Sequence, residues 1–272
     1  MSDINLSIVL YNNSYSEVLA LVHRVIGSSQ INRIYLVDNS ERPSAKFEGM
    51  NKVKYIFNKS NIGYGSAHNI AIKESIEQNV KYHIVINPDI YVEQNAIEEL
   101  SRFMGDNESV GMVMPQVLYP NGDIQYLCKQ LPSPSDLFLR RFFPFTDYAK
   151  KMIYRYELRQ MGDDIQFDIP SLSGCFMFFR IEVLKKIGLF DSRYFMYMED
   201  VDLCRRVHQV ARTAFYPKVD IIHAYGKGSY YNFKLMRAHT YSAIKYFNKW
   251  GWFFDKERRS INDRILQKIT GK

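Results

Sequence analysis

Two acidic segments of this chain carry residue types that could hold a cation or accept a proton. Asn87-Pro88-Asp89 follows an apolar run and places two oxygen-bearing side chains two residues apart, which suits a hard divalent cation bridging phosphate oxygens. Met196-Tyr197-Met198-Glu199-Asp200-Val201-Asp202 clusters three carboxylates beside apolar side chains, a setting that raises carboxyl pKa values toward those of a general base. The plainer interpretations are a turn after a strand and an acidic helix start.

Two further features are candidates for the same site. Asn61-Ile62-Gly63-Tyr64-Gly65-Ser66-Ala67-His68-Asn69 is a glycine-containing turn into a helix, where backbone amides could receive phosphate, with a plain loop as the alternative. It lacks the third glycine of a dinucleotide fingerprint and the Lys-Ser/Thr ending of a P-loop. His223 ends a short apolar run, where a histidine is more often a hydrogen-bonded structural residue than a metal ligand.

Alternating strand and helix patterns must position these residues. Apolar runs predict strands at 6–10, 34–37, 82–86, 110–114 and 219–222. The alternation of Val53, Tyr55 and Phe57 with Lys52, Lys54 and Ile56 predicts a further strand at 53–57. Helical spacing predicts helices at 18–26, 66–79 and 94–104. Ser14-Tyr15-Ser16-Glu17 has the form of a capping box, Gly27 ends that helix, and Pro120-Asn121-Gly122-Asp123 marks a hairpin turn. The order predicts an α/β fold with a mostly parallel sheet, whose ligands bind beyond the strand ends where Asp38 and Asp89 lie.

Length and composition limit the class of protein. The chain has 272 residues, 46% of them hydrophobic and 24% charged, which excludes a disordered tail or a disulfide-dense mini-protein. Its three cysteines lie far apart without zinc-binding spacing, which favours a reducing compartment. There is no apolar run of membrane-spanning length and no signal-peptide pattern at the start, so we expect a cytoplasmic protein.

The net charge of +7 is concentrated near the C-terminus. Residues 233–272 contain ten Lys/Arg, three Asp/Glu and eight aromatic residues, and a second basic-aromatic stretch runs from Phe138 to Phe145. Such a composition suits the headgroup boundary of an anionic membrane. Nucleic acid is a weaker alternative. The plainest alternative is a pair of helices that packs its aromatic residues inward.

Taken in order, these motifs resemble those of the family 2 glycosyltransferases. Val37-Asp38-Asn39-Ser40, Asn61 to Asn69 and Ile86-Asn87-Pro88-Asp89 carry the first half of the resemblance. Its second half is carried by Ser173-Gly174-Cys175-Phe176-Met177, Gly188-x-Phe190-Asp191, Phe195 to Leu203 and His223. The resemblance extends over residues 5–230 and is nearest to the bacterial rhamnosyltransferase-like branch.

This resemblance implies a GT-A fold, in which a Rossmann-like nucleotide-binding sheet flanked by helices is fused to an acceptor-binding half. The catalytic domain would be residues 1–232, with the nucleotide-binding half at 1–115 and the acceptor half at 116–232. Residues 233–272 would form a basic-aromatic helical segment near the membrane.

The activity implied by the resemblance is inverting transfer of a sugar from a nucleoside-diphosphate donor to a lipid-linked saccharide. The expected donor is dTDP-L-rhamnose, with a UDP-hexose such as UDP-galactose or UDP-glucose as the alternative. The expected process is O-antigen, capsule or cell-wall polysaccharide synthesis. The expected location is peripheral, on the inner face of the cytoplasmic membrane, with an anionic membrane surface rather than nucleic acid as partner.

The resemblance also assigns the chemistry. Asp200 would be the catalytic base, and Asp89 with His223 would hold Mg²⁺ or Mn²⁺. Asn87 stands where the family's Asp-x-Asp motif has its first aspartate, and the missing charge is expected to weaken metal binding. Lys227 is a further candidate for assisting the departing diphosphate.

The remaining site residues follow from the same alignment of motifs. Donor-binding residues would be Leu10, Tyr11, Asp38, Asn61, Gly63, Gly65, Asn69, Asn87 and Gly174. Asp38 would hydrogen-bond the pyrimidine base, and Glu199 with Asp202 would support the acceptor side. A sugar nucleotidyltransferase would need glycine and cations after the first strand, which residues 11–16 lack. A non-enzymatic polysaccharide- or nucleic-acid-binding module would leave the three aspartates of the site unexplained.

Overall fold

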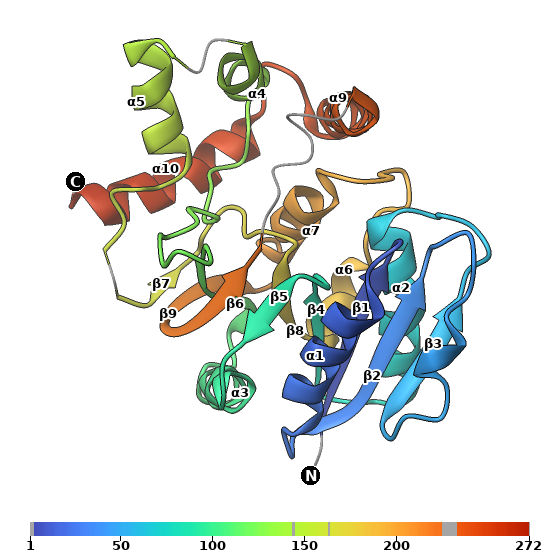
Figure 1. The fold of residues 1–272 in the computed structure, drawn as a ribbon. Helices are drawn as coiled ribbons and strands as arrows, with labels where there is room; N and C mark the ends of the chain where they lie inside the picture. The colour runs from blue at the N-terminus through green and yellow to red at the C-terminus, as the bar shows by residue number, and fades with distance from the viewer. Residues whose placement is uncertain (1–2, 143–144, 163, 225–232, 272) are drawn as a thin grey trace.

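A computed structural model describes residues 3–142, 145–162, 164–224 and 233–271 of the chain (Figure 1). The strands are β1 (Ile4–Leu10), β2 (Ile31–Asp38), β3 (Val53–Phe57), β4 (Tyr82–Ile86), β5 (Ile90–Val92), β6 (Val110–Leu118), β7 (Gln166–Phe167), β8 (Phe176–Arg180) and β9 (Arg212–His223). The helices are α1 (Tyr15–Ile26), α2 (Tyr64–Glu77), α3 (Ala96–Asp106), α4 (Pro134–Phe142), α5 (Asp147–Tyr156), α6 (Ile181–Ile187), α7 (Glu199–Val207), α9 (Phe233–Trp250) and α10 (Lys256–Thr270), with a short 3-10 turn η1 (Ala45–Phe47). Every strand and helix predicted from the sequence is present.

Among the described residues, one sheet runs through both halves of the chain. Its strand order is β3-β2-β1-β4-β8-β6-β9-β5, and β7 pairs with β9. The strands β1 to β4 are parallel, as predicted, whereas β8 runs antiparallel to both β4 and β6. The boundary predicted between residues 115 and 116 lies inside β6, so the two halves share a continuous sheet.

Helices cover both faces of this sheet because side chains alternate along each strand (Figure 1). Val9 and Val37 pack with Ala67 of α2 on one face. Ile8 and Leu36 belong to the larger core that includes the buried residues of α1. All residues of β1 are buried, so packing on both faces holds the C-terminal end of this strand in place beside the site.

The first helix and the predicted hairpin turn form as the sequence indicates. Ser14 is the N-cap of α1 and its Oγ accepts a hydrogen bond from the backbone of Glu17, while Gly27 is the C-cap. At the turn, Tyr119 and Asp123 are joined by a backbone hydrogen bond of 2.7 Å.

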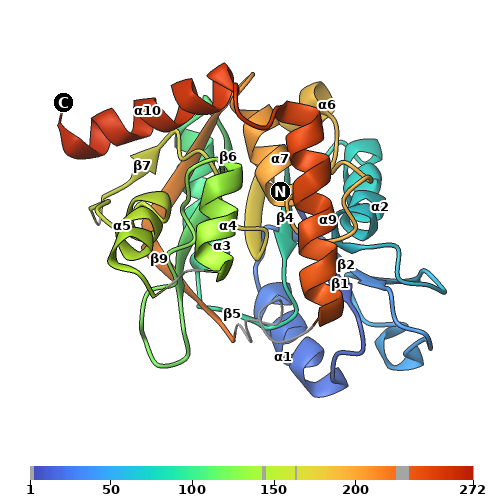
Figure 2. The ribbon, with the colours of Figure 1, turned by 90° about the horizontal axis from the view of Figure 1, so that it is seen from above.

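Helix α9 lies beside α7 (Figure 2), and buried ion pairs tie both α9 and the start of α10 to α7. Asp202 of α7 is fully buried and pairs with Lys249 of α9 at 2.6 Å. Arg205 of α7 pairs with Asp255, the N-cap of α10, also at 2.6 Å, and both side chains are 2% exposed. These contacts make the C-terminal segment part of the structure that holds α7.

The aromatic residues of the C-terminal segment divide into two groups. Tyr246 and Phe247 are buried against α7 and the loop before it, as the interpretation of an inward-packed helical pair requires. Tyr241 and Phe254 are 60% and 92% exposed, as a membrane-facing surface requires. Among the described residues, no helix has both the length and the apolar character needed to cross a bilayer.

Candidate active site

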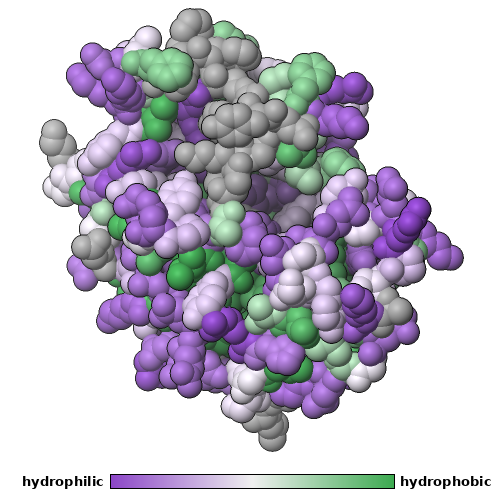
Figure 3. Space-filling view, in the orientation of Figure 1, coloured by the Kyte–Doolittle hydropathy of each residue, from purple (hydrophilic) through white to green (hydrophobic). Residues whose placement is uncertain are grey.

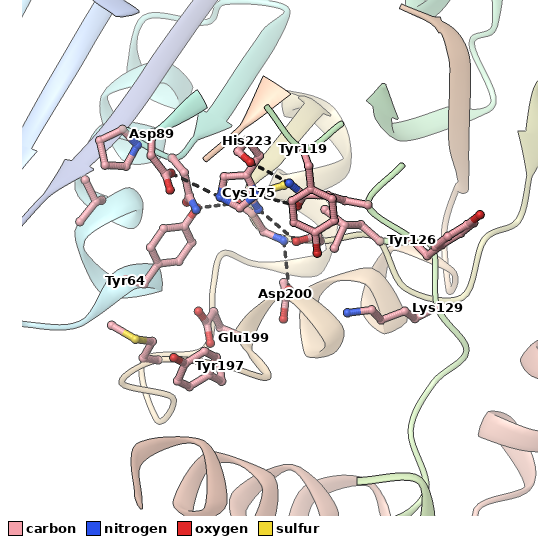
Figure 4. Close-up of a pocket in the computed structure, with 18 of the residues that line it drawn as sticks. Tyr64, Asp89, Tyr119, Tyr126, Lys129, Cys175, Tyr197, Glu199, Asp200 and His223 are labelled. Atoms are coloured by element: carbon pink, nitrogen blue, oxygen red, sulfur yellow. Dashed lines mark hydrogen bonds and ion pairs between the residues drawn. The ribbon is translucent and has the colours of Figure 1, made fainter. Parts of the chain in front are cut away.

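A cleft of about 1370 Å³ opens where β1, β4 and β9 end, and residues from both halves of the chain line it (Figure 4). The predicted site residues that line it are Tyr11, Asn61, Asn87, Asp89, Gly174, Glu199, Asp200 and His223. Those that do not line it are Leu10, Asp38, Gly63, Gly65, Asn69 and Asp202. Lys227 lies outside the described residues.

Strand pairing brings Asp89 and His223 together. β5 pairs antiparallel with β9 so that Ile90 lies opposite His223, and the preceding Asp89 places its Oδ1 3.4 Å from His223 Nε2. Gln125 sets the orientation of the imidazole. Its amide nitrogen donates to the carbonyl oxygens of Leu118 and His223, so its Oε1 is left to accept from Nδ1–H of His223 at 3.1 Å. Nε2 of His223 therefore faces Asp89.

This pair has the donor set of a minimal metal site. Burial disfavours the charged imidazole, but hydrogen bonds to Asp89 and Cys175 outweigh it and raise the pKa of His223 to about 9. A divalent cation could replace that proton between the carboxylate and the imidazole, and Gln125 provides the outer hydrogen bond typical of metal-binding histidines. Within the described ranges no group of three or more His, Cys, Asp or Glu could hold a metal. A cation here would therefore take its other ligands from a bound diphosphate.

The loop before α7 is strained where it presents the carboxylates. Tyr197 and Met198 both have φ of 68°, a left-handed conformation that costs on the order of 1–3 kcal/mol per residue. Met198 is buried among the aromatic side chains of α9, and Ser242 of α9 donates to the carbonyl oxygen of Met196 at 2.8 Å. Helix α9 thus holds the turn that aims Glu199 and Asp200 into the cleft.

Glu199 and Asp200 have different surroundings. Asp200 accepts hydrogen bonds from the backbone amides of Gly174 at 3.0 Å and Val201 at 2.8 Å. Burial raises the pKa of Asp200, and these amides oppose the rise. Burial and the charge on Asp200 raise the pKa of Glu199 to about 8, and its Oε2 has no hydrogen-bond partner among the described residues. At neutral pH Glu199 is therefore largely protonated beside the proton-accepting candidate Asp200.

Asp38 lies at the end of β2, beside the cleft but with its carboxylate turned into the protein. It is 3% exposed and accepts hydrogen bonds from the Tyr55 hydroxyl at 2.6 Å and the Ser40 amide at 2.8 Å. Burial and this contact raise the pKa of Tyr55 to about 12. The next residue, Asn39, lines the cleft instead.

The glycine turn supports the wall of the cleft. Gly63 has φ of 90°, and a Cβ there would lie 2.4 Å from the carbonyl oxygen of Phe195. Asn69 exchanges two hydrogen bonds with the backbone of Phe190, at 2.8 and 3.0 Å. These residues join α2 to the loop before α7. Gly65 packs against the Phe190 ring in the same junction.

Several cleft residues had no role in the sequence analysis. Tyr64 donates its hydroxyl hydrogen to the carbonyl oxygen of Gly174 at 2.6 Å, bridging the two halves. The position of Tyr64 between Gly63 and Gly65 of the glycine turn is the sequence feature that marks it as a candidate. Lys129 follows the hairpin turn as an isolated lysine, and no pattern marks it. Tyr119 and Tyr126 line the cleft from the same loop (Figure 4).

Comparison with known families decides the assignment. Residues 6–188 match the family model for glycosyl transferase family 2. The chain belongs to this family. The resemblance that the motifs indicated is thereby confirmed, and the match extends over residues 6–188.

Two bacterial relatives are rhamnosyltransferases. The N-acetylglucosaminyl-diphospho-decaprenol L-rhamnosyltransferase of Mycobacterium tuberculosis is 27% identical over 206 residues, covering 70% of this chain and 66% of the relative. Rhamnosyltransferase WbbL of Escherichia coli is 22% identical over 217 residues, covering 76% of this chain and 75% of the relative. This chain thus spans just under two thirds of the length of the mycobacterial protein.

A solved structure supports the fold. The crystal structure of GalNAc-T7 with UDP, GalNAc and Mn²⁺ superposes with a TM-score of 0.65 at 14% identity, covering 94% of this chain and 48% of that one. The fold is therefore GT-A, as the sequence motifs implied.

Proposed function

We propose that this protein is an inverting glycosyltransferase that moves a sugar from a nucleoside-diphosphate donor to a lipid-linked saccharide. The observation that carries the proposal is that Asp200 and the Asp89–His223 pair line one cleft at the carboxyl ends of the strands. Family membership supports the reaction class, and the two relatives favour dTDP-L-rhamnose as donor. A UDP-hexose is the alternative.

In the proposed reaction, Asp200 accepts the proton of an acceptor hydroxyl as that oxygen attacks the anomeric carbon. The bond from this carbon to the diphosphate oxygen breaks, and its electron pair leaves with the nucleoside diphosphate. Attack from the side opposite the leaving group inverts the anomeric configuration. The backbone amides of Gly174 and Val201 orient the carboxylate and stabilise its ionised form, which is the form that accepts the proton.

Asp89 and His223 would hold Mg²⁺ or Mn²⁺, which when bound offsets the charge that develops on the diphosphate. GalNAc-T7, of the same fold, was crystallised with Mn²⁺. Activity that survives exhaustive EDTA treatment would remove the cation from the proposal.

The test is release of nucleoside diphosphate across dTDP-, UDP- and GDP-sugars with a lipid-linked acceptor. Asp200→Asn should lower kcat by about 10² to 10⁴ while leaving the fold intact, because only the proton acceptor is lost. Asp106→Asn, at an exposed position ending α3, is the matched control and should keep full activity. Near-normal turnover of a folded Asp200→Asn protein would refute the assignment of the base.

We further propose that the protein binds the anionic inner face of the cytoplasmic membrane through α4, α5 and α9, in O-antigen, capsule or cell-wall polysaccharide synthesis. Hydrophobic side chains lie at the upper edge of the molecule over α5 and α9 (Figure 3). Phe138, Tyr148 and Tyr241, one from each helix, are 53%, 65% and 60% exposed. Leu137 of α4 packs with the buried aromatic residues of α9, so these helices are neighbours.

Vesicle flotation tests this surface directly. A triple variant, Phe138→Ser, Tyr148→Ser and Tyr241→Ser, should lose binding to anionic vesicles, whereas Val210→Ser at an exposed site on the loop after α7 should not. Unchanged binding of the folded triple variant would show that another surface contacts the membrane.

A further inference from the structure

Three cations line the cleft beyond Asp200 and have no part in the reaction just proposed. Lys129 comes from the loop after β6, Arg140 from α4, and Arg159 from the segment after α5. Glu157 lies among them and pairs with Arg140 at 3.7 Å and Arg159 at 2.6 Å. One carboxylate against three cations leaves this group of four residues with a net charge of +2 at neutral pH.

The two arginines are held in place. The guanidinium of Arg140 lies 4.7 Å from the ring centre of Tyr156, and that of Arg159 lies 4.7 Å from the ring centre of Tyr126. Both also contact Glu157, whose side chain is 13% exposed. Guanidinium groups fixed in this way lose little freedom when they bind an anion, which favours phosphate as a ligand.

Of the three cations, Lys129 has its charge least neutralised by direct contacts, since both arginines pair with Glu157. Its backbone is fixed by two hydrogen bonds of 2.9 Å with Ser171, and its amine is directed toward Asp200 in the cleft (Figure 4). Within the described part of the chain, its ammonium group has no hydrogen-bond or ion-pair partner at contact distance. Burial and the neighbouring Arg140 lower the pKa of Lys129. A bound anion would offset both effects, because its negative charge would stabilise the buried ammonium group and screen it from Arg140.

We propose that Lys129, Arg140 and Arg159 form the subsite for the diphosphate of the lipid-linked acceptor. This assignment rests on the proposed function, which places the donor diphosphate at Asp89 and His223. The acceptor hydroxyl must reach Asp200, so an anion bound on the other side of Asp200 belongs to the acceptor. A saccharide joined to a lipid through a diphosphate would present its sugar to Asp200 and its phosphates to the three cations.

The surroundings of the subsite fit the rest of such an acceptor. Phe138 is 53% exposed and belongs to the same helix as Arg140, α4, which is one of the helices proposed to face the membrane. A lipid chain leaving the phosphates would pass along this helix into the bilayer. The subsite thereby joins the membrane-facing helices to the catalytic carboxylate.

The experiment compares two acceptors with the full-length protein. One is N-acetylglucosaminyl diphosphate carrying a short prenyl chain, and the other is the octyl glycoside of the same sugar, which has no phosphate. Lys129→Gln and Arg159→Gln should each raise KM for the first acceptor by about 10- to 100-fold, because a charge-assisted contact is lost. KM for the octyl glycoside and for the donor should change by less than about twofold, as expected for sites without direct contact. Lys218→Gln, at an exposed position of β9, is the matched control.

Other results would overturn the proposal in recognisable ways. Equal losses with both acceptors, with a shifted pH profile of kcat, would mean that Lys129 acts by tuning Asp200. A raised donor KM would assign the cations to the donor diphosphate. No loss with either acceptor would exclude the subsite.

A binding measurement keeps the subsite separate from the proposed reaction. Calorimetric titration of inorganic pyrophosphate into protein saturated with nucleoside diphosphate should show binding that Lys129→Gln weakens by at least about tenfold. This readout needs no transferase activity, so failure of the proposed reaction and failure of the subsite give different results. Unchanged binding in Lys129→Gln would contradict the assignment.

Discussion

Replacing Glu199 by glutamine tests whether burial keeps this carboxyl protonated at neutral pH. Burial, and then the charge on Asp200, raise the pKa of Glu199 from 4.5 to about 8. Between pH 4.5 and about pH 8, Glu199 is protonated in the folded protein and ionised in the unfolded chain. The free energy of unfolding therefore falls as pH rises through this interval. Each pH unit is worth about 1.4 kcal/mol, so the full interval removes at most about 5 kcal/mol.

Glutamine is neutral at every pH and close in shape to the protonated acid. The free energy of unfolding of Glu199→Gln should therefore not fall as pH rises through this interval. We expect similar free energies of unfolding for both proteins near pH 5, and an advantage of about 3–5 kcal/mol for the variant near pH 8. Urea denaturation at intervals across this range measures the difference. The variant should also keep most of its turnover at neutral pH, because the amide, like the protonated acid, leaves Asp200 beside an uncharged neighbour.

Glu41→Gln is the control, since Glu41 is an exposed loop residue and its replacement should give a difference that does not vary with pH. If the difference between Glu199→Gln and the parent protein were also constant from pH 5 to pH 8, Glu199 would be ionised in the folded state. The description of a protonated acid beside Asp200 would then be wrong.

Three further outcomes are expected. Gln125→Met should raise the Mg²⁺ concentration needed for half-maximal activity by about 10- to 100-fold, because His223 loses its orienting hydrogen bond; an unchanged metal requirement would separate Gln125 from the metal site. Gly63→Ala should destabilise the fold by about 2 kcal/mol more than Gly49→Ala, since both have positive φ but only Gly63 faces a neighbouring carbonyl oxygen; equal losses in thermal unfolding would refute the clash. Lys249→Met should lower Tm by several degrees more than replacement of an exposed α10 lysine, because buried Asp202 loses a partner.

Much of the N-terminal half of the chain was predictable because its signals are local. Most of the parallel strands contain short apolar runs, whereas β3 alternates apolar residues with Lys54, and Ser14 and Gly27 delimit α1 as their residue types require. The carboxyl ends of parallel strands meet at one edge of a sheet. That rule predicted a shared crevice for Asp38 and Asp89, and the structure places Asp89 in the cleft and Asp38 beside it.

The features of the site and the sheet that the sequence does not predict depend on contacts between residues far apart in the chain. The side chain of Asp38 faces inward, where Tyr55 of the neighbouring strand donates a hydrogen bond to it. The residues around Asp38 in the sequence give no sign of this distant partner. The backbone of Lys129 is held at the site by hydrogen bonds to Ser171, a partner distant in the sequence. The antiparallel strand β8 joins the halves through pairing with β4 and β6, and periodicity alone does not specify such pairing.

The same long-range contacts decide how membrane binding should be tested. Deleting residues 233–272 would remove the basic and aromatic side chains, but it would also leave Arg205 without Asp255 and Asp202 without Lys249. Unpairing one buried charge typically costs about 3–5 kcal/mol, so a truncated chain would unfold or lose the strained turn before α7. Loss of vesicle binding in that protein would then report on folding rather than on a lipid contact. Substitutions at exposed positions such as Tyr241 leave these ion pairs intact, and only they separate the surface that meets the membrane from the helix that holds Asp200 in place.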